Sequence, residues 1–138
     1  MNRLPIMKRL AIEISKTIFY IYAFLWLARP RRARTIEDVY KLFYIDFLML
    51  DERDVEIVKM REYELITRCR NPCPVLKLAQ HLNLDTRFVC RVVSEPVCKY
   101  VLRRLNPSIV FERNYNYIRP YADGCEERIY IERQKNNR

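Results

Sequence analysis

The fold of this chain is decided by a short central segment, where residues 68–78 read RCRNPCPVLKL. Pro74 suits the first turn of a helix, because the N–H group that it lacks would have no partner there. Cys73 is therefore the predicted N-cap of a helix that runs to about Leu82. A strand-like pattern ends just before this turn and a helical pattern starts just after it, so the segment joins a sheet to helices.

Two stretches have the pattern of β-hairpins. From Asp54 to Arg70, side chains alternate with period two on either side of a charged break at residues 61–62. After Asn106-Pro107, residues 109–118 and 127–133 are rich in β-branched and aromatic residues and are joined by a loose turn over 120–124. We expect the two hairpins to form one antiparallel sheet.

Three further segments have helical signals. Thr35 and Asp38 predict a capped helix to about Leu50, with one shared apolar face. That face consists of Ile36, Val39, Phe43 and Phe47. Asp85 is expected to cap a helix over 86–93, and Ser94 a separate helix that ends near residue 105. The predicted fold is an α+β domain over residues 35–133, an antiparallel sheet covered by helices, followed by a polar tail over 134–138.

Residues 1–34 form an N-terminal segment with a predicted apolar helix over 6–28 and a basic patch. Its continuous apolar run, residues 18–28, has about 11 residues, whereas a bilayer span needs roughly 20. Four arginines follow at positions 29, 31, 32 and 34. The helix either packs against the body or a second copy in a homodimer, or anchors the protein at an anionic membrane surface.

The charge of the chain is concentrated in this segment. Residues 1–34 hold eight basic residues and one acid, so 7 of the 9 net positive charges lie there. The nearly neutral body disfavours nucleic acid as a partner. Five cysteines without a signal peptide indicate a reducing, cytoplasmic location, with attachment to the periphery of a membrane as the alternative. A single glycine cannot build a glycine-rich phosphate loop.

Cys73 is the candidate catalytic residue. Unpaired N–H groups at a helix N-terminus favour a thiolate, and Arg68 and Arg70 are close in sequence. The alternative is that Cys73 is a small buried hydrophobe, as free cysteines often are. The only histidine, His81, is eight residues further on, about 12 Å along a helix, so a Cys–His dyad is excluded and a carboxylate or water must act as the base.

Metal binding is not expected, because the spacing of Cys90 and Cys98 does not match a second zinc-ligand pair, and no cofactor is assigned. Along the strand that begins near residue 109, Arg113 faces away from Glu112 and Asn114. Whichever charge points inward needs a partner and is a means of fixing a polar ligand. The alternative is a set of ordinary cross-strand pairs on an exposed face.

The segment also resembles a known family. Cys73-Pro74, Cys90, Asn106-Pro107, Glu112-Arg113 and Gly124-Cys125, in this order, are similar to motifs of the aminothiazoline-carboxylate hydrolases. A looser similarity extends to four-vinyl-reductase-type ligand-binding domains. The resemblance covers roughly residues 54–132 and departs from the family at residues 125–127 and 94–95.

The resemblance implies a small-molecule pocket between sheet and helices, with weak hydrolase activity. The implied ligand-binding residues are Cys73, Cys90, Glu112, Arg113, Asn114 and Cys125. The alternative function is a non-catalytic adaptor that docks to a membrane surface or a partner protein through residues 18–34.

Overall fold

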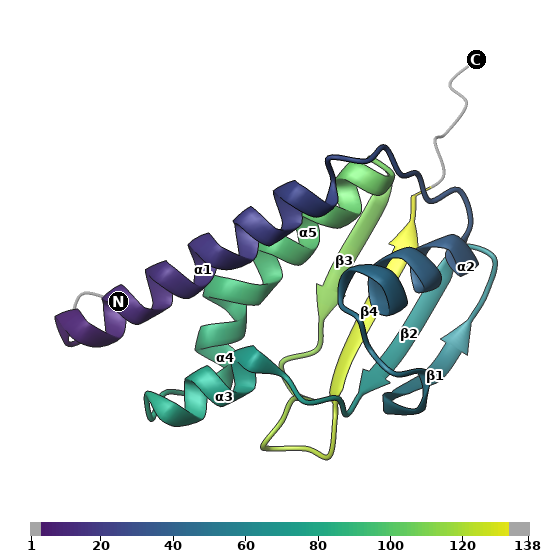
Figure 1. Ribbon diagram of the computed structural model, residues 1–138. Coiled ribbons are helices and arrows are strands. Elements are labelled where there is room, and N and C mark those ends of the chain that lie inside the picture. Colours follow the sequence, from purple (N-terminus) through teal and green to yellow (C-terminus); the bar gives the residue numbers. More distant parts are fainter. Residues whose placement is uncertain (1–3, 133–138) are drawn as a thin grey trace.

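The protein is built around one four-stranded antiparallel sheet with helices against one face (Figure 1). The computed structural model describes residues 4–132. The strands β1 (Val55–Met60), β2 (Glu64–Cys69), β3 (Ile109–Arg113) and β4 (Cys125–Ile131) lie in the order β1-β2-β4-β3. The predicted α+β class and the sheet of two hairpins covered by helices are confirmed. The polar tail expected over 134–138 lies outside the described residues.

The register of β2 and β4 gives the sheet two chemically different faces. Leu65, Thr67 and Cys69 of β2 are buried against the helices, and their partners on β4 share that face. The partners are Ile129, Glu127 and Cys125. The alternate residues point outward and form charged cross-strand pairs, including Arg68–Glu126 at 2.9 Å.

The first strand of the second hairpin is shorter than its composition predicts, and the second strand starts two residues earlier, at Cys125. β3 ends at Arg113 instead of continuing to residue 118. The Asn114 side chain accepts a hydrogen bond from the backbone N–H of Asn116 (3.0 Å), and the Asn114 carbonyl accepts one from Tyr117. This local turn takes the backbone out of the ladder, as asparagine side chains commonly do.

In the described part of the chain, the helical layer is made of seven helical segments. They are α1 (Ile6–Trp26), α2 (Ile36–Val39), which continues as the π-helical η1 (Tyr40–Phe47), α3 (Pro74–His81), α4 (Thr86–Val89), which continues through the π-helical η3 (Cys90–Ser94), and α5 (Glu95–Leu105). A 3₁₀ turn, η2 (Glu52–Asp54), precedes the sheet. The Thr35–Asp38 capping box forms as predicted, and the predicted apolar face of the following helix is buried. Within residues 4–132, no helix is long and apolar enough to cross a bilayer.

Ser94 does not start a new helix, contrary to the prediction. Its backbone is helical and its side chain caps nothing, so the chain runs without a break from α4 through η3 into α5. The Glu95 N–H donates to the Cys90 carbonyl five residues back. This wider turn makes room for Pro96, whose ring would clash with the Val92 carbonyl in a regular α-helix.

The apolar core has two parts. The larger joins the inner face of the sheet to η1, α5 and the C-terminal half of α1, and Phe47 lies at its centre. The smaller joins α3, α4 and η3 to Ile12 of α1. Helix α1 therefore belongs to the same core as the rest of the domain.

We expect Phe47→Ala to lower the free energy of unfolding by about 3–5 kcal/mol, the usual cost of truncating a buried aromatic side chain. Phe47 is fully buried and its ring lies 5.1–6.0 Å from those of Phe19, Tyr22, Trp26 and Phe43. Urea unfolding followed by circular dichroism measures the change. Phe24→Ala, on the exposed side of α1, is the matched control and should change stability by less than about 0.5 kcal/mol.

Candidate functional site

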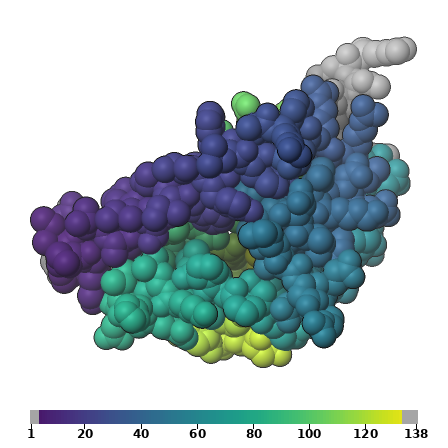
Figure 2. Space-filling model, in the orientation of Figure 1, coloured from purple at the N-terminus to yellow at the C-terminus, as the bar shows by residue number. Residues whose placement is uncertain are grey.

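A cavity of about 1000 Å³ lies between the two parts of the core. Its apolar wall comes from α1, η1, α3 and η3, including Phe19, Phe47, Leu78 and Val93. Figure 2 shows the hollow between the purple helix α1, the blue η1 segment and the teal-green α3 segment. The cavity is of a size and apolar character typical of small-molecule sites.

All five cysteines line this cavity. Cys69 and Cys125 lie opposite each other on β2 and β4. Cys73 is the N-cap of α3, as predicted, and is half-buried. Cys90 and Cys98 are buried on the continuous helix that starts at α4. The fold therefore gathers into one place thiols that are up to 56 positions apart in the chain, from Cys69 to Cys125.

A buried ion pair lies in the same cavity. The Arg113 Nη2 donates to Glu127 Oε1 at 3.3 Å, and both side chains are only 7% exposed. The Arg113 Nη1 donates to Ser94 Oγ at 3.1 Å. Although burial disfavours its charged form, the Glu127 carboxylate raises the pKa of Arg113 well above its ordinary value. Arg113 is thus a fixed positive charge inside the domain.

On its other side, Glu127 accepts a hydrogen bond from one buried hydroxyl group, which in turn accepts one from a second buried hydroxyl group. The Tyr44 hydroxyl donates to Glu127 Oε2 at 3.3 Å and accepts from Thr67 Oγ1 at 2.9 Å. Burial, and then the nearby Glu127 carboxylate, raises the pKa of Tyr44 well above its ordinary value, so Tyr44 remains a donor. These successive hydrogen bonds hold the Glu127 carboxylate in one position beside Arg113.

One polar atom at the site lacks a partner. Among the described residues, the buried Nε of Arg113 has no hydrogen-bond acceptor, although two of its other nitrogens are satisfied. An unsatisfied buried donor costs about 1–3 kcal/mol. A hydrogen-bond acceptor on a molecule in the cavity would remove this cost.

Arg119 is a second guanidinium at the cavity that the sequence did not identify. Its Nε donates to Cys125 Sγ at 3.4 Å and its Nη1 donates to the Asn71 carbonyl in the turn before Cys73. The arginines expected near Cys73 have other partners. Arg68 pairs with Glu126 and stacks on Tyr117, and Arg70 pairs with Glu56.

The predicted ligand-binding residues separate into two groups. Cys73, Cys90, Arg113 and Cys125 all line the cavity. Glu112 and Asn114 lie on the opposite face of the sheet, where Glu112 pairs with Arg128 and Asn114 donates to Glu126 at 2.8 Å. The alternation along β3 therefore turns Arg113 inward and its two neighbours outward.

The remaining candidate groups are His81 and the side chains that could bind a metal. His81 is the last residue of α3, at the end opposite Cys73, so the two cannot share a proton directly even though both line the cavity. Among residues 4–132, no three His, Cys, Asp or Glu side chains are grouped as metal ligands.

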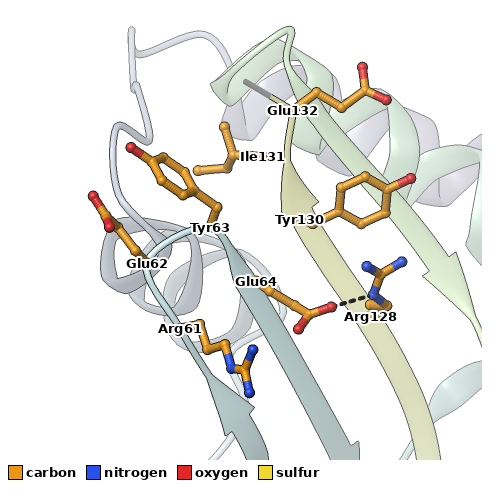
Figure 3. A pocket seen from close by; sticks show the side chains of 8 residues that line it. All are labelled: Arg61, Glu62, Tyr63, Glu64, Arg128, Tyr130, Ile131 and Glu132. Atoms are coloured by element: carbon orange, nitrogen blue, oxygen red, sulfur yellow. Dashed lines mark hydrogen bonds and ion pairs between the residues drawn. The ribbon is translucent and has the colours of Figure 1, made fainter. Parts of the chain in front are cut away.

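A second, shallower pocket of about 820 Å³ lies at the β1–β2 turn and the end of β4 (Figure 3). Its central charges neutralise one another. Glu64 pairs with Arg128 at 2.6 Å and with Lys59 at 2.9 Å, and Arg128 also approaches Glu112. This pocket lacks the enclosure and the unsatisfied donor of the cavity, so the cavity is the candidate site.

Cys73 and Cys125 should react faster with iodoacetamide than the other three thiols of the native protein, because these two are half-buried at the cavity whereas Cys69, Cys90 and Cys98 are buried. Burial raises the pKa of Cys69 far above its ordinary value, that of Cys90 to about 11 and that of Cys98 to about 12. These three should label at least about tenfold more slowly near neutral pH. Peptide mapping by mass spectrometry gives the ranking, with unfolded protein as the control in which all five react alike. Equal rates for Cys73 and Cys98 would contradict it.

Comparisons of the chain with protein-family models, with curated proteins and with solved structures found no match. The features that bear on function are therefore the cavity, the buried Arg113–Glu127 pair and the thiols around them.

Proposed function

We propose that this protein binds a small molecule that carries a carboxylate and an apolar body, with the carboxylate at Arg113. The single observation that carries this proposal is the buried Arg113 Nε, a charged donor without an acceptor at an otherwise largely apolar cavity. A carboxylate supplies an acceptor of the right charge and geometry for a guanidinium. The apolar body would contact the Phe19, Phe47 and Leu78 side of the cavity.

The guanidinium donors at the site support a ligand group that accepts hydrogen bonds. Arg113 is already neutralised by Glu127, but Arg119 and Lys77 also line the cavity. Asp51 and Asp54 line it too, and the Asp51 carboxylate is paired with Arg53 at 2.8 Å. A ligand carboxylate could accept hydrogen bonds from the guanidinium groups of Arg113 and Arg119, whereas a ligand cation could not.

The binding proposal can be tested with Arg113→Lys, which keeps the positive charge beside Glu127 but removes the Nε–H donor. Octanoate and octanamide are the probes, since they share an apolar body and differ in charge. We expect octanoate to bind at least about tenfold more tightly than octanamide to the unchanged protein, and Arg113→Lys to lose that difference. Isothermal titration calorimetry measures both affinities.

Arg128→Lys is the matched control, because Arg128 is also paired with a glutamate but lies on the outer face of the sheet. It should bind octanoate as the unchanged protein does. Equal affinities for the acid and the amide, or unchanged octanoate binding by Arg113→Lys, would refute a carboxylate site. Native mass spectrometry of freshly purified protein would show any retained ligand directly.

We propose in addition that the cavity supports slow hydrolysis of a thiazoline carboxylate, with Cys73 as the nucleophile. The Cys73 sulfur would bond to the electrophilic ring carbon, the ring carbon–sulfur bond would break, and the thiol proton would pass to the departing sulfur. One water would then hydrolyse the adduct and restore the Cys73 thiol. This proposal is supported by the resemblance to the aminothiazoline-carboxylate hydrolases and by the position of Cys73 at the cavity.

Turnover would appear as release of a new thiol from the thiazoline, measured by mass spectrometry of the products. Cys73→Ser should lower the rate at least about a hundredfold, since the nucleophile is lost. Cys98→Ser removes another cavity thiol and should keep most of the activity. A Cys73→Ser protein that is as active as the unchanged one would remove Cys73 from the reaction and leave the binding proposal intact.

A further inference from the structure

Helix α1 carries a continuous exposed apolar stripe. Eight large apolar side chains on this helix are between 50% and 77% exposed. They are Ile6, Met7, Leu10, Ile14, Ile18, Ile21, Phe24 and Leu25. Six of them, from Met7 to Leu25, follow one another at intervals of three or four residues, so they share one side of the helix.

The stripe lies on the side of α1 that faces away from the domain. Ile12 and Ala23, on the opposite side, are buried in the two parts of the core. Figure 1 shows α1 running along the outside of the helical layer, with its N-terminal half extending past α5. A 21-residue helix is about 31 Å long, so the stripe is far larger than the scattered apolar residues of an ordinary surface.

The same segment holds most of the net charge of the protein. Between residues 4 and 34 there are seven basic residues and one acid, Glu13. The exposed Arg29, Arg32 and Arg34 follow the helix directly. Hydrogen bonds between Ala33 and the end of α5 bring this loop beside the exposed Arg103 and Arg104. A dense positive cluster therefore lies at the C-terminal end of the stripe.

We infer that α1 docks flat on an anionic lipid bilayer, with the stripe in the interface and the arginine cluster on the lipid headgroups. An amphipathic helix with cations beside its apolar face is a membrane-surface element, and α1, with 21 residues, is not apolar enough along its length to span a bilayer. Two copies paired through this stripe would bring two strongly positive segments together. The charge is complementary to anionic lipid and not to itself.

Vesicle flotation of the full chain tests this inference. Vesicles of phosphatidylcholine alone are compared with vesicles in which about a third of the lipid is phosphatidylglycerol. We expect at least about tenfold stronger partition to the anionic vesicles, and a marked loss of binding in about 1 M NaCl. Equal partition to both vesicles, or none to either, would overturn the inference.

Two pairs of variants separate the apolar and the electrostatic contributions. Ile14→Ser with Ile21→Ser should abolish flotation, whereas Ile57→Ser with Val58→Ser, on an exposed part of β1, should not. Arg29→Gln with Arg32→Gln should weaken binding only to anionic vesicles, and the exposed Arg53→Gln is its control. Light scattering that shows a stable dimer, made monomeric by the Ile14 and Ile21 changes, would assign the stripe to self-association and overturn the lipid inference.

Discussion

The buried ion pair between Arg113 and Glu127 is the constraint on which the rest of the structure depends. Five elements supply a group to it: β3, β4, η1 through Tyr44, β2 through Thr67 and η3 through Ser94. Burying two charges costs several kcal/mol per ion unless the pair is well satisfied, so these elements cannot shift independently. The Arg113 Nε, which has no acceptor among the described residues, lowers stability, and an apolar pair in the same space would avoid that cost, so stability alone does not account for this network.

How much of this could be predicted depends on whether a feature is local. The Thr35–Asp38 capping box, the Cys73-Pro74 helix start and the opposed directions of Glu112 and Arg113 follow from short-range rules, and the structure has all three. The partner of Arg113 was missed because it depends on how β3 and β4 align, and the register places Arg113 opposite Glu127. Tyr44 was missed because it lies outside the predicted apolar face, whereas in the structure it is fully buried on η1 and its hydroxyl donates to Glu127.

The π-helical stretch η3 explains why the predicted helix boundary at Ser94 was wrong and why that error bears on function. Serine followed by a proline two positions later is a common helix-start pattern, but here the wider turn accommodates Pro96 without ending the helix. Because the chain stays helical, Ser94 Oγ is free to accept from Arg113 and lies 3.8 Å from Cys98 Sγ. If Ser94 capped a helix, its hydroxyl would accept from a backbone N–H of that helix. Because it caps nothing, the hydroxyl accepts from Arg113 instead and adds a polar group to the lining of the cavity.

The cavity and the stripe on α1 meet at one residue. Ile18 is 61% exposed on the stripe and also lines the cavity, together with Phe19 and Tyr22 on the inner side of the same helix. If α1 lies on a bilayer as inferred, the rim of the cavity lies at the headgroup level, where amphipathic carboxylates accumulate. The proposed ligand has an apolar body and an acidic group, so it would partition into the membrane interface beside the rim of the cavity. The two proposals rest on separate observations, but they fit together. A ligand that partitions into the membrane interface could enter the cavity and reach Arg113 without crossing bulk water.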